Sequence, residues 1–198
     1  MRLAILSLSA FLAIGACDKP NIPRAPASAE LTSITWDNQN ERFVSDGTPL
    51  DTVKLWRFGS DAEEFSGMNV SMAPVNEGLE IRATGNDPAI RTPAGLNISG
   101  EDATRVLVRL TRIARAQSWD GSLYFSTSRV GESGSRRASP VNNDPPRLGE
   151  DQLVVYDMAN PSSASRAWRR STIDQIRFDL DNEAGGAFII HEVAVIAR

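Results

Sequence analysis

His191, the single histidine, and the acids Asp179 and Asp181 are the residues of this chain with the most direct catalytic chemistry. An imidazole can act as a general base, and glycoside hydrolysis uses two carboxylates at a set separation. Asp179 and Asp181 alternate with apolar residues, which predicts that both carboxylates lie on one face of a strand. No nucleophile motif accompanies His191, and no group of His and Cys residues has zinc-ligand spacing. The sequence therefore favours a non-catalytic protein without a cofactor, with Asp179 or Asp181 as candidate ligands for a structural Ca²⁺.

Aromatic and arginine side chains offer binding chemistry instead. An indole or phenol ring in a polar segment can stack on a sugar ring, and a guanidinium group can hold a carboxylate or sulfate bidentately. Residues 129–150 are rich in Ser, Gly, Pro and Asn, and a loop of this length is usually functional or disordered. The predicted ligand contacts are Trp119, Tyr124, Arg129, Arg136 and Arg137. If these residues line one concavity, ligand binding is favoured; if they are scattered, a role in protein assembly is favoured.

Cys17 is the only cysteine, so it cannot form an internal disulfide. It follows a charged start, an apolar run over residues 3–14 and two small residues, an order typical of a secretory signal peptide. The apolar run is shorter than the roughly 20 residues that span a bilayer. Residues 14–17 resemble the lipobox of bacterial lipoproteins. That resemblance implies cleavage before Cys17, acylation of Cys17 and anchoring in the inner or outer membrane of a bacterial cell envelope.

The chain is expected to have three segments. Residues 1–16 are the lipoprotein signal peptide, residues 17–30 are the lipidated Cys17 with a Pro-rich tether, and residues 31–198 are one folded domain. Prolines keep a tether extended, and a domain of this length buries enough surface to fold without disulfides. The formal net charge of −4 lacks the basic field on which nucleic-acid binding depends, so no nucleic-acid partner is expected.

Short runs of alternating apolar and polar residues, separated by Asn, Asp, Gly and Pro clusters, fill the folded domain. This pattern predicts an all-β jelly roll or β-sandwich of two antiparallel sheets. Residues 104–117 fit either a basic amphipathic helix or a strand, and the alternation of Val106, Val108 and Leu110 favours the strand. The other predicted runs are 31–36, 54–58, 68–72, 78–84, 88–91, 95–98, 121–127, 152–156, 173–180 and 187–196.

The order of several motifs points to a known family. An early strand ends in Trp56 and Phe58, an Asp-Pro turn at residues 87–88 precedes a short strand, and residues 173–179 lead through a glycine turn into a last strand. Together with Leu123 to Thr127, these motifs resemble the galactose-binding-like jelly rolls of carbohydrate-binding modules over about residues 50–198. The resemblance implies a two-sheet jelly roll that binds a glycan or surface polymer, and several such modules hold a structural Ca²⁺.

These observations lead to one expected function and two alternatives. We expect a lipid-anchored, non-catalytic envelope protein that binds a glycan or surface polysaccharide. The first alternative is a structural lipoprotein that contacts a protein partner in an envelope complex. The second is a small jelly-roll enzyme acting on polysaccharides, for which Arg177, His191 and Tyr124 or Tyr156 would have to meet on one concave sheet.

Overall fold

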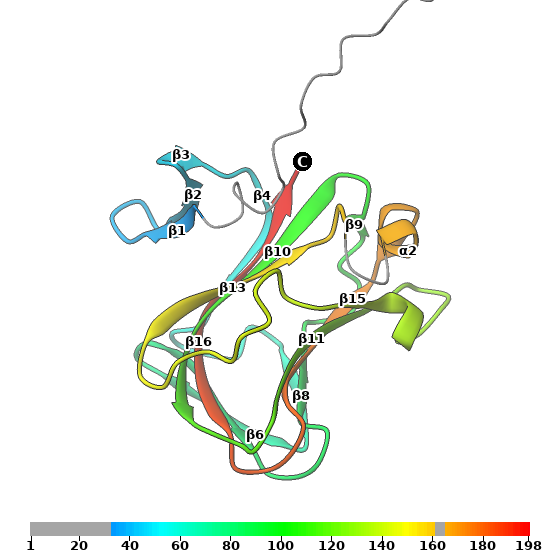
Figure 1. Ribbon diagram of the computed structural model, residues 1–198. Coiled ribbons are helices and arrows are strands. Elements are labelled where there is room, and N and C mark those ends of the chain that lie inside the picture. Colours follow the sequence, from blue (N-terminus) through cyan, green and yellow to red (C-terminus); the bar gives the residue numbers. More distant parts are fainter. Residues whose placement is uncertain (1–32, 161–164) are drawn as a thin grey trace, which may run out of the picture.

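The computed structural model describes residues 33–160 and 165–198, and β-strands dominate both ranges. Figure 1 shows two layers of strands, with the helix α2 (Ser165–Arg169) at their margin. The 129–150 segment contains a 3-10 turn, η1 (Gly134–Arg136), and the two-residue strand β12 (Arg137–Ala138). None of the helices in these ranges is long and apolar enough to cross a membrane. Cys17 and the predicted signal peptide and tether lie outside the described residues.

Two antiparallel sheets form the predicted β-sandwich. The larger sheet has the strand order β13-β10-β16-β7-β6, and β4 pairs with the part of β16 beyond β7. The other sheet has the order β12-β11-β15-β8-β5, and a short pair, β14 with β9, lies beside them. The bounds are β4 Thr52–Arg57, β5 Ser66–Met68, β6 Val70–Val75, β7 Gly78–Ala83, β8 Ala89–Arg91, β9 Ile98–Ser99, β10 Ala103–Ala114, β11 Trp119–Ser126, β12 Arg137–Ala138, β13 Asp151–Asp157, β14 Thr172–Ile173, β15 Gln175–Asp181 and β16 Ala187–Ala197.

Alternation along the long strands builds the core between the two sheets. In β10, Val106, Val108 and Leu110 are buried in the main core, whereas Leu107 points to the opposite face and joins a second apolar cluster. Burying such side chains is worth about 1.5–3 kcal/mol each, which explains why the alternation fixes the strand's orientation. The strand interpretation of residues 104–117 is confirmed over most of its length.

A small third sheet covers the outer face of the six-stranded sheet. It consists of β1 (Ile34–Asp37), β2 (Arg42–Ser45) and β3 (Thr48–Pro49), and Figure 1 shows it on the side away from β11 and β15. Phe43 of this sheet is fully buried and packs in one cluster with Leu107 and Ala194. The sequence predicted β1, through the apolar spacing of residues 31–36, but not β2 or β3.

One buried ion pair joins the two sheets of the sandwich. Arg112 of β10 donates a hydrogen bond to Oδ1 of Asp181 at the end of β15, over 2.8 Å, and the two side chains are 4% and 1% exposed. Burial raises the pKa of Asp181 to about 6, although the Arg112 charge opposes this shift. The other oxygen, Oδ2, is buried without a hydrogen-bond partner among the residues that the structure describes.

Candidate functional site

The outer face of the five-stranded sheet carries one row of polar side chains across four strands. Tyr124 of β11 lies directly opposite Arg137 of β12 on one side and Arg177 of β15 on the other, and Arg177 lies opposite Arg91 of β8. Directly paired residues share a face of a sheet. Their neighbour Leu123 is buried in the core, so the row faces outward. We call this surface the Tyr124 face.

The aromatic ring of Tyr124 stands between two guanidinium groups. The guanidinium carbon of Arg177 lies 5.3 Å from the ring centroid, and that of Arg137 lies 6.0 Å from it. Both distances are within the range of cation–π contacts. Burial raises the pKa of the Tyr124 hydroxyl, so this hydroxyl remains a neutral donor and acceptor at neutral pH.

Carboxylates fix the guanidinium of Arg177 from three directions. Its Nε lies 2.5 Å from Oδ1 of Asp179, and its terminal nitrogens lie 2.8 Å from Asp87 and 3.3 Å from Glu132. Burial raises the pKa of Asp179 to about 6, although Arg177 opposes this shift. Burial also acts to raise the pKa of Glu132, but the hydrogen bonds from Arg91 and Arg177 hold it below its usual value. Charge-assisted bonds of this kind hold side chains in a defined geometry.

The other two arginines of the row are held in the same way. Arg91 makes a bidentate contact with Glu132, at 2.7 and 3.0 Å. Arg137 donates to the hydroxyl of Ser122 over 2.7 Å and to Asp120 over 3.3 Å. The face thus combines three guanidinium groups with the carboxylates of Asp87, Asp120, Glu132 and Asp179. Its positive and negative charges therefore nearly cancel.

The structure brings together only two of the five predicted contact residues, Tyr124 and Arg137. Trp119 instead turns inward at the end of the sandwich, where its ring packs against Phe188 with centroids 5.9 Å apart. A register shift between Trp119 and Ser122 allows this turn. Gly121 lies in the shift with φ +68°, and a Cβ there would meet the Trp119 ring at 2.7 Å. Trp119 therefore closes the core rather than joining the Tyr124 face.

The other two predicted arginines are not members of the paired row. Arg129 belongs to the turn after β11, where its backbone N–H donates to the hydroxyl of Thr127. Arg136 ends η1, and its guanidinium donates to Ser133 over 3.3 Å. Neither guanidinium pairs with a carboxylate of the Tyr124 face among the described residues. The sequence missed Arg91, Asp87 and Glu132, and the only local signal for them was the Asp-Pro turn at residues 87–88.

The structure separates the residues that the polysaccharide-enzyme alternative requires on one concave sheet. His191 belongs to β16 in the six-stranded sheet, where its Nδ1 lies 2.5 Å from the carbonyl oxygen of Glu77 and its Nε2 lies 2.9 Å from the hydroxyl of Thr111. The core therefore lies between His191 and the row of Tyr124 and Arg177. Tyr156 is fully buried and donates to the carbonyl of Gly121.

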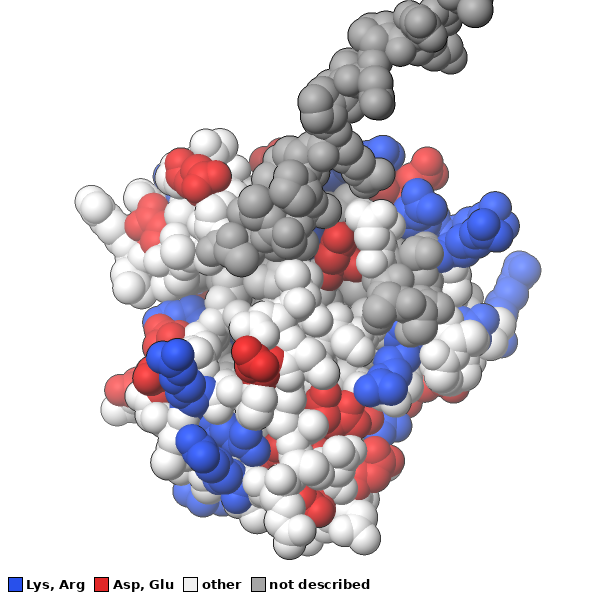
Figure 2. Space-filling model, viewed as in Figure 1, with Lys and Arg blue, Asp and Glu red and all other residues white. Residues whose placement is uncertain are grey.

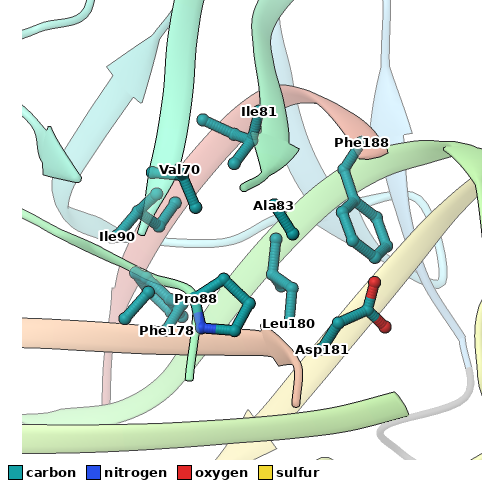
Figure 3. Close-up of a pocket in the computed structure, with 10 residues that line it drawn as sticks. Val70, Ile81, Ala83, Pro88, Ile90, Phe178, Leu180, Asp181 and Phe188 are labelled. Carbon is teal, nitrogen blue, oxygen red and sulfur yellow. The ribbon is translucent and has the colours of Figure 1, made fainter. Parts of the chain in front are cut away.

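The expectation that Asp179 and Asp181 present their carboxylates on one face is also wrong. Asp179 binds Arg177 on the Tyr124 face, whereas Asp181 binds Arg112 between the sheets. Figure 3 shows Asp181 beside Phe188 at the side of a small apolar cavity. This cavity has a volume of about 10 Å³, too small for a sugar unit. No group of three or more His, Cys, Asp or Glu residues in the described ranges could hold a metal ion.

No protein-family model matches this sequence, and no curated protein matches it. Solved structures similar to this chain include carbohydrate-binding modules. A mutant of a family 29 module is 11% identical, with a TM-score of 0.44, and the match covers 72% of this chain and 91% of that chain. A family 6 module from Clostridium stercorarium, in complex with cellobiose, is 12% identical with a TM-score of 0.39, over 75% of this chain and 97% of that chain. At these values the similarities carry no argument about a ligand.

Proposed function

We propose that this chain is a lipid-anchored, non-catalytic protein of the bacterial cell envelope that binds a glycan or surface polysaccharide through the Tyr124 face. The observation that supports this proposal is the row of Arg137, Tyr124, Arg177 and Arg91, which four paired strands hold on one surface. Side chains held on strands and by ion pairs lose little conformational freedom on binding, which favours affinity.

The chemistry of the Tyr124 face suits a ligand rich in hydroxyl groups. A sugar hydroxyl both donates and accepts hydrogen bonds, so it can contact the guanidinium groups and the carboxylates of the face together. Because each arginine already has an acidic partner, the face offers no unbalanced positive charge. Figure 2 shows acidic and basic side chains interspersed over the side of the molecule that it views. We therefore propose an uncharged glycan, rather than the acidic polymer that Arg136 and Arg137 by themselves suggested.

The anchoring part of the proposal rests on sequence alone. Residues 14–17 resemble a lipobox, and Cys17 is the sole cysteine of the chain. Stable membrane anchoring takes about two acyl chains or an equivalent second signal, which a multiply acylated cysteine provides. In this proposal, the Pro-rich residues 18–30 hold the β-sandwich away from the membrane surface.

One observation favours a second candidate function. Trp119 packs against the core, and Arg129 and Arg136 are not members of the paired row, so the five predicted residues do not form the single lined concavity expected of a binding site. The assembly function is therefore the alternative that the binding experiment has to separate from glycan recognition.

A glycan array followed by titration of each retained oligosaccharide tests the proposal. Tyr124→Ala and Arg137→Gln should each weaken binding, by about 1–3 kcal/mol for the loss of the tyrosine ring. Arg82→Gln is the matched control. Arg82 is also an exposed arginine with an acidic partner, Glu80, but both residues belong to β7 of the six-stranded sheet, away from the Tyr124 face. Retention of no glycan, or equal weakening by Arg82→Gln, would reject the Tyr124 face as a glycan site. Specific capture of one envelope protein from a solubilised envelope fraction would then support the assembly function.

A further inference from the structure

A second pocket lies on the opposite side of the β-sandwich from the Tyr124 face. It forms where β1, an edge strand of the small sheet, approaches β13, an edge strand of the six-stranded sheet. Its volume is about 300 Å³, at the lower end of the range for small-molecule sites. Polar side chains of β1, β10, β13 and the turn after β1 line it together with Trp36. We call this the Trp36 pocket.

Trp36 is a half-buried aromatic side chain that the fold holds in place. It lies directly opposite Phe43 in the β1–β2 pair, and the two rings meet edge to face with centroids 4.8 Å apart. The guanidinium carbons of Arg57 and Arg109 lie 6.0 and 5.8 Å from the Trp36 ring. A ring fixed by such contacts loses little conformational freedom when a ligand binds, and part of this ring lines the pocket.

The polar groups of the pocket surround one arginine. Arg109 pairs with Asp151 over 2.5 Å and with Glu192 over 3.0 Å, so two carboxylates neutralise its charge. The Asp151 side chain is still 47% exposed and can accept further hydrogen bonds. Asn38 and Gln152 add amide groups to the lining. The lining thus holds one basic and one acidic group, Arg109 and Asp151, which pair with each other, so the site suits an uncharged ligand with several hydroxyl groups.

We propose that the Trp36 pocket binds one uncharged pyranose unit of a glycan, with the sugar ring against Trp36 and its hydroxyls bonded to Asp151 and the neighbouring amides. This site would add a second glycan contact on the opposite face of the protein, and it does not require the Tyr124 face to bind. The sequence offered no sign of it, because β1 and β13 are more than a hundred residues apart.

Nuclear magnetic resonance of the ¹⁵N-labelled protein tests this proposal through the indole N–H signals of the four tryptophans. Trp36→Phe identifies the Trp36 signal by its loss. The probes are the methyl glycosides of glucose, galactose, mannose and xylose and their β-1,4-linked disaccharides, at millimolar concentrations. At least one probe should shift the Trp36 signal in a saturable manner while the signals of the buried Trp56 and Trp168 stay in place.

Variants test whether binding depends on the Trp36 pocket. Trp36→Ala and Asp151→Asn should each weaken binding of the active probe by about tenfold or more, whereas Arg82→Gln, at an exposed arginine outside both sites, should leave that affinity unchanged. Asp151→Asn keeps the test valid if Trp36→Ala disturbs the small sheet. The proposal is overturned if no probe shifts the Trp36 signal, or if Asp151→Asn binds as well as the unmodified protein. It is also overturned if only extended peptides, which could pair with the edges of β1 and β13, shift that signal.

Discussion

Replacing Arg112 with methionine tests how the two sheets of the sandwich are joined. Arg112 is the ion partner of the buried Asp181 carboxyl, and its guanidinium carbon lies 5.3 Å from the Phe188 ring. A methionine fits such an aromatic environment but leaves Asp181 without a positive charge. Removing one partner of a buried pair typically costs about 3–5 kcal/mol. We therefore expect Arg112→Met to lower the free energy of unfolding by about this amount at pH 8.

The loss should depend on pH in a defined direction. The pKa of Asp181 is already raised to about 6 in the folded protein, and removing Arg112 raises it further because the opposing charge is gone. A raised acid pKa means that the folded state binds the proton more tightly than the unfolded chain. Stability is then highest at low pH and falls as pH rises through the folded pKa, by about 1.4 kcal/mol per unit. Arg112→Met should accordingly regain much of its stability between pH 8 and pH 5.

Urea unfolding of the purified variants at a series of pH values measures this effect. Arg112→Met/Asp181→Asn is the control, because it has no carboxyl at this position and should lose most of the pH dependence. A loss of less than about 1 kcal/mol at pH 8, well below the usual cost of an unpaired buried charge, would contradict this reasoning. A loss that is the same at pH 5 and pH 8 would contradict the role of Asp181 titration.

Two further predictions concern the anchor and the core. Cys17→Ser should move the protein from the membrane to the soluble envelope fraction, since each acyl CH₂ group contributes about 0.8 kcal/mol to anchoring. Retention of the Cys17→Ser variant on membranes after a high-salt wash would exclude a lipid anchor at Cys17. Tyr156→Phe removes the hydroxyl that donates to the carbonyl of Gly121 over 2.9 Å. It should lower the free energy of unfolding by about 1 kcal/mol in urea titrations, and an unchanged midpoint would show that this bond contributes nothing.

The fold was largely predictable because strand formation leaves a local pattern. Alternation placed Val106, Val108 and Leu110 on one face of β10, and the same pattern located the final strands β15 and β16. The site was less predictable. Tyr124 and Arg137, chosen by residue type, lie together on the Tyr124 face, whereas Trp119 packs against the core because the register shift at Gly121 turns its ring toward Phe188. A shift of this kind depends on the partner strand and leaves no periodic signal.

The sequence by itself determined that this chain forms an all-β domain and that Cys17 ends a lipobox-like segment, because alternation and short motifs are local properties. Only the tertiary structure decided which charges meet. Arg91 and Arg177 lie 86 positions apart but are paired in register on neighbouring strands, and the core separates His191 from both. Strand order and register depend on how distant segments bury their apolar faces together. They therefore determine the Tyr124 face and the Trp36 pocket in a way that no single segment of the sequence reveals.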